Sequence, residues 1–457
     1  MAENCAIIRH QQYARGEPVN GEQNRNDSGW VCLEEKTAGA PATKKRRISA
    51  PKKQKKLRRG RRKARNKRHI LRGTAITLAG LAALYCVLVF SHIPLIEKWR
   101  TIYIETAMGT MNHQWLATMF LPQSVIDDVM SGRMTIELRQ EEYNSSWDTG
   151  TDTSFDDTGE EAVDTWDDIR EQFSEAYAEI DQKSFWAYMA AHKKSDVLDE
   201  DGYLMIDQAD YDEEETGIQT IYGDPVCAID TRNGIVIVGL KGDGYSGRMA
   251  IVKNPGQVRL AVSDTLGSSG SYLKQICRST NAVLGINASG FSDPEGTGNG
   301  GDVFGMVVSG GRTVIDTLDT KMKVIGMDSG NRLNISSTLP RGTRDAMQFS
   351  PALIVNGKQL ISGSSGWGLQ PRSVIGQTKD GQMLLTVIDG RQPGYSIGIT
   401  LGDLTDILYQ YGAYQACNLD GGSSAVMYYR GRNITRSSAV TPDKGRHIPN
   451  AWIVDAN

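Results

Sequence analysis

The stretch from residue 73 to residue 96 contains no Asp, Glu, Lys or Arg, and it restricts the possible folds of this 457-residue chain more than any other feature. Its length matches the ~20 apolar residues that a helix needs to cross the hydrocarbon core of a bilayer. We therefore expect a transmembrane helix over residues 73–96. The apolar core lies far from residue 1 and no small-residue cleavage pattern follows Phe90, so we expect an uncleaved signal anchor.

A strongly basic segment precedes this span. Residues 1–72 hold 21 Lys and Arg against 6 Asp and Glu, a composition that cannot bury itself, and this predicts a disordered basic tail. The positive-inside rule places such a tail in the cytoplasm and the remainder of the chain outside the cell. A nucleic-acid-binding tail is the competing interpretation. Its position directly before an apolar span favours topology and contact with anionic lipids, so we expect no nucleic-acid partner.

Two segments of different character follow the span. Residues 97–135 mix apolar and polar residues in a pattern that predicts a membrane-proximal helical segment. Residues 137–215 hold 26 acidic against 5 basic residues, which predicts a solvated acidic stalk over residues 136–216, with a short helix near residues 165–191. No stretch there matches the EF-hand loop pattern, so an extended stalk is favoured over a Ca²⁺ site.

Residues 217–457 read as short strands separated by glycine-rich turns. A helix is expected between Thr400 and Tyr411, with Thr400 and Asp403 as its capping pair, and a weaker one over residues 271–279. Because strands outnumber helices, the pattern predicts an α+β domain of mixed β-sheets with a few packed helices. The expected strands are residues 234–240, 249–252, 258–262, 282–286, 303–308, 323–327, 352–355, 372–376, 383–388, 414–419, 425–429 and 451–454.

One motif in this domain sets a carboxylate against a glycine-serine turn directly after an apolar run: Asn418-Leu419-Asp420-Gly421-Gly422-Ser423-Ser424. Glycines at such a turn let backbone N–H groups approach an anion. Asp302 and Asp389 also lie at glycine-rich ends of apolar runs. Glycosidic bond cleavage uses paired carboxylates, one to protonate the leaving oxygen and one to support the developing cation or activate water. Asp302, Asp389 and Asp420 are therefore the candidate catalytic residues.

Arginines and asparagines occupy similar positions at the ends of strands. The guanidinium fork suits a phosphate diester, and Asn side chains can order sugar hydroxyls. Each residue alone is common in ordinary loops, so the inference depends on their gathering at several strand ends. The candidate substrate-binding residues are Asn287, Arg372, Arg391, Asn418, Gly421, Gly422, Ser423 and Arg446.

Cysteine and histidine add little to the assignment. Cys227, Cys277 and Cys417 allow at most one disulfide within the domain, and no Cys-x-x-Cys pair is present, so a Cys/His zinc site is not expected.

An ordered series of motifs over roughly residues 220–457 resembles the phosphodiester glycosidase family. This family includes a lysosomal enzyme that removes N-acetylglucosamine from a phosphodiester and bacterial proteins labelled as exopolysaccharide biosynthesis proteins. The series is Asn287-Ala288-Ser289-Gly290-Phe291, Gly301-Asp302 with Gly305, Pro351 to Gly357, Arg372 with Gly376, Asp389-Gly390-Arg391, Ser396 to Leu401, Asn418 to Ser424, and Arg446 to Asn450.

The resemblance implies hydrolysis of a sugar-1-phosphodiester to a free sugar and a phosphomonoester. It implies that Arg372 and Arg391 clamp the phosphate and that Asp389 and Asp420 are the leading carboxylates. One motif departs from the family, because Asn287-Ala288-Ser289-Gly290-Phe291 stands where Asn-Gly-Gly-Phe-Phe is usual, and this restricts the backbone next to the substrate.

Three functions fit these observations. The leading one is a membrane-anchored extracellular hydrolase acting on sugar-phosphate diesters of cell-surface polysaccharides or glycans. A non-catalytic module that binds a polyanionic glycan during exopolysaccharide assembly is the second. The third is a metal-dependent phosphodiesterase that cuts the P–O bond, with Asp302, Asp389 and Asp420 holding a divalent cation. Only this last function requires a cofactor.

Overall fold

The computed structural model describes residues 52–457 apart from 111–112, 148–164, 214 and 295–297. The chain divides into two compact units, residues 1–76 and 77–457. The described part of the first unit is the beginning of helix α1 (Lys52–Phe90), which continues into the second unit. Residues 52–72 are thus helical, which differs from the expected disorder, because Lys and Arg are good helix formers. The rest of the expected tail lies outside the described residues.

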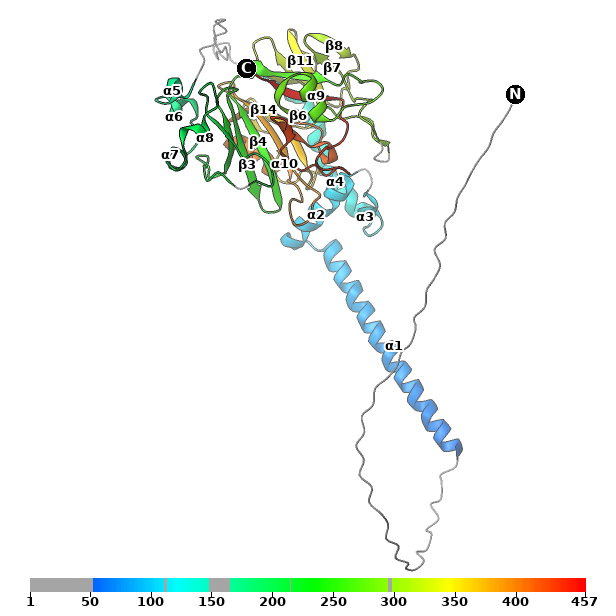
Figure 1. Cartoon of the computed structure of the whole chain (residues 1–457). Helices are drawn as coiled ribbons and strands as arrows, with labels where there is room; N and C mark the ends of the chain where they lie inside the picture. Colours follow the sequence, from blue (N-terminus) through cyan, green and yellow to red (C-terminus); the bar gives the residue numbers. More distant parts are fainter. Residues whose placement is uncertain (1–51, 111–112, 148–164, 214, 295–297) are drawn as a thin grey trace, which may run out of the picture. The chain divides into compact units, whose positions relative to one another are not determined.

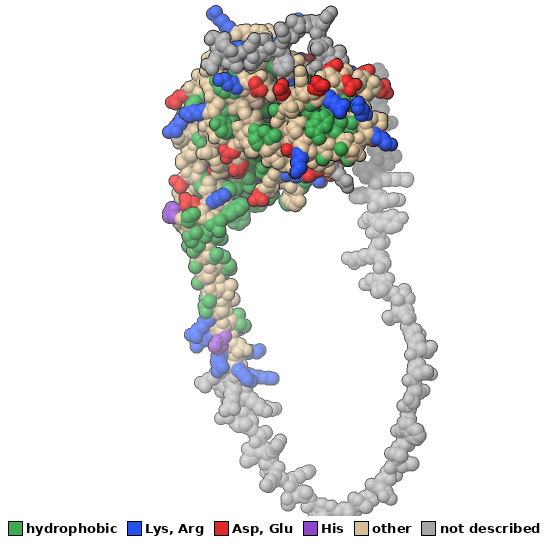
Figure 2. All heavy atoms as spheres, turned by 90° about the vertical axis from the view of Figure 1, so that its left-hand side faces the viewer, with side chains coloured by type: hydrophobic (Ala, Val, Ile, Leu, Met, Phe, Trp, Pro, Cys, Tyr) green, Lys and Arg blue, Asp and Glu red, His purple; other side chains and the backbone are tan. Residues whose placement is uncertain are grey.

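Among the described residues, one helix is long and apolar enough to cross a membrane, over Arg62–Phe90 of α1. Figure 2 shows Lys and Arg side chains at one end of its described stretch and hydrophobic side chains further along. The helix ends at Phe90, and Pro94 starts helix α2 (Pro94–Met108). The expected span over residues 73–96 is therefore interrupted, because proline is tolerated at a helix start but not in its interior.

The helices expected over residues 97–135 are present. Helices α3 (Trp115–Thr118) and α4 (Gln123–Arg139) pack with α2 around Ile104, Ala117 and Ile126, and a 3₁₀ turn, η1 (Gln140–Glu142), follows α4. The segment is bound to the rest of its unit as well. The Gln140 side chain accepts a hydrogen bond from the Ala352 N–H at 2.7 Å.

The acidic segment is folded where it is described, which differs from the expected extended stalk. It forms α5 (Trp166–Ile169), α6 (Phe173–Ala176), α7 (Gln182–Ala191) and α8 (Lys194–Val197), drawn beside β3 in Figure 1. Phe173 and Phe185 stack at 4.1 Å between ring centroids, and both are buried with Trp166 against one face of the large sheet. The apolar residues at helical spacing outweigh the surrounding charge, since acidic side chains on such helices can remain in water. Residues 148–164 and 214 of the stalk expected over residues 136–216 lie outside the described residues.

Within the described part of the chain, the largest sheet has nine antiparallel strands in the order β1-β2-β3-β4-β15-β14-β16-β12-β13. Side chains alternate between its faces, so Ile237 enters one apolar core while Val238 enters another. Its strands are β1 (Met205–Asp207), β2 (Val226–Asp230), β3 (Ile235–Gly242), β4 (Tyr245–Val252), β12 (Ala352–Val355), β13 (Lys358–Gln359), β14 (Arg372–Thr378), β15 (Met383–Ile388) and β16 (Ala413–Asn418).

Two five-stranded antiparallel sheets contribute to the core on one face of the large sheet. The first has the order β10-β9-β11-β7-β8, with β7 (Val307–Ser309), β8 (Arg312–Ile315), β9 (Lys323–Asp328), β10 (Leu333–Ser336) and β11 (Thr343–Phe349). The second has the order β18-β17-β6-β19-β5, with β5 (Val258–Val262), β6 (Ala282–Asn287), β17 (Met427–Tyr429), β18 (Arg432–Asn433) and β19 (Asn450–Asp455).

Helices cover the remaining sheet faces. Helix α10 (Leu401–Gln410) buries Leu401, Leu404 and Leu408 in the core on the other face of the large sheet. Its start is capped as expected, because the Thr400 hydroxyl accepts a hydrogen bond from the Asp403 N–H at 3.1 Å. Helix α9 (Leu273–Ser279) packs on β6 and β19, and a 3₁₀ turn, η2 (Pro255–Gln257), precedes β5. The domain is therefore α+β, and the expected fold class is confirmed.

Candidate functional site

The topology of the large sheet brings three functional segments to one edge. Strand β14 runs antiparallel between β15 and β16, with Arg372 opposite Ile388 and Val374 opposite Asn418. The start of β14 therefore lies between the ends of its two neighbours. The loops that follow β15 and β16 carry Asp389 and Asp420, so these carboxylates and Arg372 belong to the same edge.

The chain before Arg372 is enclosed by glycines from both loops. A Cβ atom on Gly390 would lie 2.8 Å from the Pro371 nitrogen, and one on Gly421 would lie 2.6 Å from the Pro371 oxygen. Any side chain at either position would collide with this backbone. The glycines of both motifs are thus required for close packing of the three strand ends.

Arg372 is a buried cation. Its side chain is 6% exposed, and Nη2 donates to the carbonyl oxygens of Trp367 and Gly368, both at 2.9 Å. Its Nε is buried without a hydrogen-bond partner, and Arg372 forms no ion pair among the described residues. Burial, with the charges of Arg391 and Arg133, lowers the pKa of Arg372 to about 9. Burying an unpaired charge is expensive, so this arrangement favours an incoming anion.

Arg391 lies beside it in an unusual backbone conformation. Its φ is +59°, in the left-handed region that residues other than glycine rarely adopt and that clusters at functional sites. Its Nε and Nη2 donate to the Gln370 Oε1 at 3.0 and 2.7 Å. A Cβ atom on Gly422 would lie 3.1 Å from the Arg391 Nη2, so this guanidinium rests against the glycine turn.

Asp420 is half-buried at the same turn. Its backbone N–H donates to the Ala288 oxygen at 3.1 Å, and its own carbonyl accepts from the Asn287 Nδ2 at 2.6 Å. Burial raises the pKa of Asp420 to about 6, against the opposing effects of a Ser424 hydrogen bond and the Arg446 charge. The carboxyl group is therefore mostly ionised at neutral pH, close to Arg391.

Asp389 is more deeply placed, with 2% of its side chain exposed. Its Oδ2 accepts from the Tyr395 hydroxyl at 2.8 Å and from the Arg436 N–H at 3.0 Å, while Oδ1 is buried without a partner. Burial raises the pKa of Asp389 to about 7, although both hydrogen bonds oppose the rise. Ser437 follows Arg436 in the chain, and its hydroxyl donates to the Ser423 backbone oxygen at 2.9 Å. The segment 436–437 therefore links the Asp389 pocket to the glycine-serine turn.

Arg446 braces the turn and is already paired. Its Nη1 donates to the Asp293 Oδ2 at 2.7 Å and to the Ser423 Oγ at 3.2 Å. The guanidinium also lies over the Phe291 ring, 4.5 Å from its centroid. An arginine whose charge is balanced by a neighbouring carboxylate is a weaker phosphate ligand than Arg372 or Arg391.

Asn287 and Asn418 form hydrogen bonds with other residues of the domain. The Asn287 Oδ1 accepts from the Ser373 hydroxyl at 2.7 Å, and the Asn418 Nδ2 donates to the Ser350 oxygen at 3.2 Å. Both side chains are buried, with 1% and 3% exposed. Their amides hold strand ends together, while the Asn418 Oδ1 is buried without a partner, and a contact of either residue with a sugar hydroxyl stays a prediction. The Gly422 N–H is likewise used internally, because it donates to the Pro371 oxygen at 3.0 Å.

Asp302 is more exposed than the other two candidate carboxylates. Its side chain is exposed, and its backbone oxygen accepts from the Ser292 N–H at 2.7 Å. No group of three or more His, Cys, Asp or Glu side chains among the described residues is arranged to hold a metal ion. The ligand set considered from the sequence, Asp302 with Asp389 and Asp420, is therefore not assembled here.

Three partners at this site have no recognisable sequence motif: Gln370, Tyr395 and Asp293. Gln370 and Tyr395 lie within a few residues of Arg372 and Asp389, and Asp293 follows the Asn287 to Phe291 motif. Polar residues in the same loops as the candidate residues are the only sequence signal for them. The cysteines considered for a disulfide, Cys227, Cys277 and Cys417, are all buried and free.

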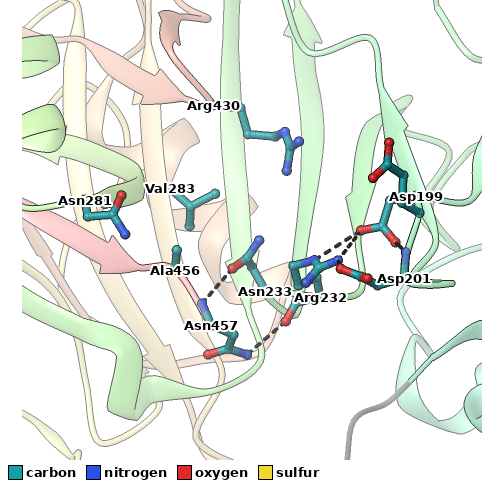
Figure 3. Close-up of a pocket in the computed structure, with 11 residues that line it drawn as sticks. Asp199, Asp201, Arg232, Asn233, Asn281, Val283, Arg430, Ala456 and Asn457 are labelled. Carbon is teal, nitrogen blue, oxygen red and sulfur yellow. Dashed lines mark hydrogen bonds and ion pairs between the residues drawn. The ribbon is translucent and has the colours of Figure 1, made fainter.

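A cavity of about 570 Å³ lies elsewhere in the domain (Figure 3). Val283 near the start of β6 lines it, whereas Asn287 at the site lies at the end of that strand. Its Arg232 is balanced by an ion pair with Asp199 at 2.9 Å and another with Asp201. None of the candidate site residues lines this cavity, and its two arginines are paired with Asp199, Asp201 and Asp230, so we do not place the chemistry there.

The sequence of the site region matches a known family. Residues 280–455 match the phosphodiester glycosidase family (NAGPA). The chain is 26% identical over 175 residues to the SPbeta prophage-derived uncharacterized protein YomE of Bacillus subtilis (strain 168). That alignment covers 34% of this chain and 26% of the relative, so the chain spans about a quarter of that protein's length.

Two solved structures are similar in part. The zebrafish N-acetylglucosamine-1-phosphodiester alpha-N-acetylglucosaminidase catalytic domain, auto-inhibited by its pro-peptide, has a TM-score of 0.41 and 17% identity, covering 49% of this chain and 82% of that one. A hypothetical protein from Synechocystis has a TM-score of 0.37 and 18% identity, covering 52% of this chain and 65% of that one.

The residues matched by the family run from the start of β6 to the end of β19 and include every candidate site residue described above. Residues 280–455 are therefore similar in sequence to the phosphodiester glycosidase family, and the similarity covers every candidate site residue.

Proposed function

We propose that this chain is a membrane-anchored hydrolase that cleaves the glycosidic bond of a sugar-1-phosphodiester in a cell-surface polysaccharide or glycan. One observation supports this most strongly. Arg372 and Arg391 lie side by side, neither forms an ion pair among the described residues, and the partly exposed carboxylate of Asp420 is close to them. Two adjacent unpaired guanidinium groups fit a phosphate, and the carboxylate fits the sugar carbon attached to it.

The leaving group explains why the arginines matter. Cleavage of the bond between the sugar carbon and the phosphate oxygen releases a phosphomonoester, whose second pKa is about 6. This group leaves readily as an anion, so catalysis gains most from stabilising the charge that builds on its oxygens. The exposed Arg391 contacts the phosphate directly in this proposal, and the buried Arg372 adds positive charge behind it.

The carboxylates act on the sugar side. Asp420 supports the positive charge that develops at the sugar carbon, or it takes the proton from the attacking water. The water oxygen bonds to the sugar carbon as the carbon–oxygen bond to phosphate breaks, and one proton is released. Asp389 is the second acidic group, and Tyr395, whose hydroxyl donates to it, offers a proton path to this buried carboxyl.

Product identification tests the proposal against its alternatives. The purified full-length chain in detergent is incubated with a synthetic N-acetylglucosamine-1-phosphodiester, and the products are identified by mass spectrometry. We expect free sugar and a phosphomonoester. Release of sugar-1-phosphate would instead support cleavage of the P–O bond, and binding without turnover would support a glycan-binding module.

The variant Asp420→Asn should lower kcat at least ~100-fold, because it removes the charge of the carboxylate closest to the arginines. The control is Asp316→Asn, which removes a carboxylate from an exposed loop residue after β8 and should leave activity unchanged. Thermal unfolding of both variants establishes that they are folded. Full activity in folded Asp420→Asn would refute the assignment of this carboxylate.

A further inference from the structure

The loop that precedes Arg372 lies against helix α2, which belongs to the segment between the apolar helix and the catalytic domain. The Leu369 N–H donates to the Thr106 Oγ1 at 3.0 Å, and the Gln370 Nε2 donates to the Thr106 backbone oxygen at 3.0 Å. Three residues earlier in the same loop, the Gly366 N–H donates to the Glu105 Oε1 at 2.8 Å. Two consecutive residues of α2 thus satisfy three donors of one loop.

The approach is close enough to exclude any side chain at the contact. A Cβ atom on Gly368 would lie 2.4 Å from the Thr106 nitrogen, and one on Gly366 would lie 2.1 Å from the Arg133 Cβ of α4. Between these glycines, Trp367 is 9% exposed, and the Arg133 guanidinium lies 5.1 Å from the centroid of its ring. The loop is therefore packed backbone to backbone against the helical segment.

The same loop holds both arginines of the proposed phosphate site. The carbonyl oxygens of Trp367 and Gly368 accept from Arg372, and the Gln370 Oε1 accepts from Arg391. The Gln370 amide is thus fixed at both ends. Because its nitrogen is held by the carbonyl of Thr106, its oxygen must face Arg391. Without that anchor the amide can rotate and present its N–H groups to the guanidinium.

We infer that helix α2 is part of the phosphate-binding site, with Thr106 and Gln370 as positioning residues that set the guanidinium of Arg391. The inference rests on the proposed function, which makes the bound anion a phosphodiester. It gives residues 97–135 a role in turnover in addition to connecting the membrane span to the domain. The catalytic unit extends beyond the residues that match the family, since α2 lies before residue 280.

A matched pair of substitutions at Thr106 isolates the contribution of its hydroxyl group. Thr106→Val keeps the shape of the side chain but removes the acceptor for the Leu369 N–H, whereas Thr106→Ser keeps the acceptor. In the full-length chain in detergent, we expect Thr106→Val to raise both the KM for the phosphodiester and the inhibition constant for inorganic phosphate about tenfold, because the loop loses the Leu369 hydrogen bond that holds it beside the Gln370 contact with Thr106. Thr106→Ser should stay within about twofold of wild type.

A second variant removes the relay itself. Gln370→Leu deletes both the donor to Thr106 and the acceptor for Arg391, so we expect it to weaken phosphate inhibition at least as much as Thr106→Val. A purely structural role predicts a different pattern: a lower melting temperature and a lower kcat, with KM and the inhibition constant unchanged. That pattern in Thr106→Val and Gln370→Leu would overturn the inference.

The inference and the proposed function fail in distinguishable ways. If the wild type releases no sugar from any phosphodiester, the proposed function fails. Calorimetric titration of the full-length chain with inorganic phosphate then decides the inference without turnover. Weaker phosphate binding in Thr106→Val than in Thr106→Ser supports it, and equal binding in wild type, Thr106→Val and Gln370→Leu refutes it.

Discussion

Two aspartates at this site have raised pKa values for the same reason, but to different extents. Burial is the main cause for both, and it takes Asp389 to about 7 and Asp420 to about 6. Asp389 is held by a tyrosine hydroxyl and a backbone N–H in an almost closed pocket, while Asp420 keeps partial contact with solvent and with the Arg446 charge. An acid–base pair near neutral pH needs one carboxyl group that is protonated and one that is ionised. Different surroundings that separate the two pKa values provide this.

The pH dependence of kcat/KM should therefore be bell-shaped. We expect activity to fall below a pH of about 6 as Asp420 is protonated, and above a pH of about 7 as Asp389 loses its proton. In Asp389→Asn the residue cannot ionise, so the alkaline limb should disappear while the acidic limb remains. An alkaline limb unchanged in this variant would show that another group causes it.

The individual residues were predictable to unequal degrees. Arg372, Arg391 and Asp420 lie at the ends of strands that are visible as apolar runs, so their convergence could be inferred from the sequence. Their partners could not. The contact between Gln370 and Thr106 joins residues separated by 264 positions, and no local pattern encodes it. The burial of the Asn287 and Asn418 amides also could not be inferred, because burial of an amide cannot be read from its neighbours in sequence.

At the scale of elements, the loop over residues 362–370 is enclosed by α2 and α4 on one side and supports two arginines on the other. Its glycines permit the approach, and Gly368 is the tightest contact with the backbone of α2. A second glycine, Gly310, has the same φ of +56° but no atoms within 4 Å of a Cβ. Comparing Gly310 with Gly368 therefore separates two contributions to the free energy of unfolding: the strain of a left-handed backbone and the collision of a new methyl group with its surroundings.

Replacing each of these glycines with alanine tests the packing of this loop. Gly310→Ala should destabilise the protein by about 1–2 kcal/mol, the cost of the left-handed conformation alone. Gly368→Ala should cost at least ~2 kcal/mol more, because its methyl group collides with the Thr106 backbone. Urea unfolding midpoints measure both effects. Equal destabilisation would mean that the loop and α2 separate easily.

Elements with strong local signals were predicted well. The apolar runs of β5, β12 and β15 match the observed strand bounds, and α10 begins at Leu401, directly after its capping Thr400. In the acidic segment the helical spacing near residues 165–191 was recognised, but its packing against a distant sheet was not, because its charge favoured an extended chain. Whether the charge or the aromatic residues decide the structure depends on the sheet against which the segment packs, and the sequence of the segment carries no information about that sheet.

At the scale of the whole molecule, the proposed anchor has two kinds of support. Helix α1 contains a stretch apolar enough to cross a bilayer, and the residues before it are strongly basic. Its large side chains, among them Leu81, Leu84 and Leu88, are exposed, as they would be in contact with lipid. We propose that residues 1–72 are cytoplasmic and that the catalytic domain is outside the cell.

Two fractionation experiments test this topology. The full-length protein should remain with membranes after alkaline carbonate extraction, since a spanning helix is held by its buried apolar surface. Protease added to intact cells should cleave the C-terminal domain while an epitope placed in the basic tail stays protected. Release by carbonate would argue against a spanning helix, and a protected C-terminal domain would reverse the orientation.

The short break between α1 and α2 limits the reach of such an enzyme. Only Ser91 to Ile93 separate the two helices, and a linker of this length extends at most about 10 Å. Arg100 of α2 is bonded across this connection, because its Nη1 donates to the Val89 and Ser91 oxygens. In the proposed arrangement α2 borders the phosphate site, so we expect an anchored enzyme to act on bonds that lie close to the bilayer. Glycans would have to present their phosphodiester links close to the lipid headgroups to be cut.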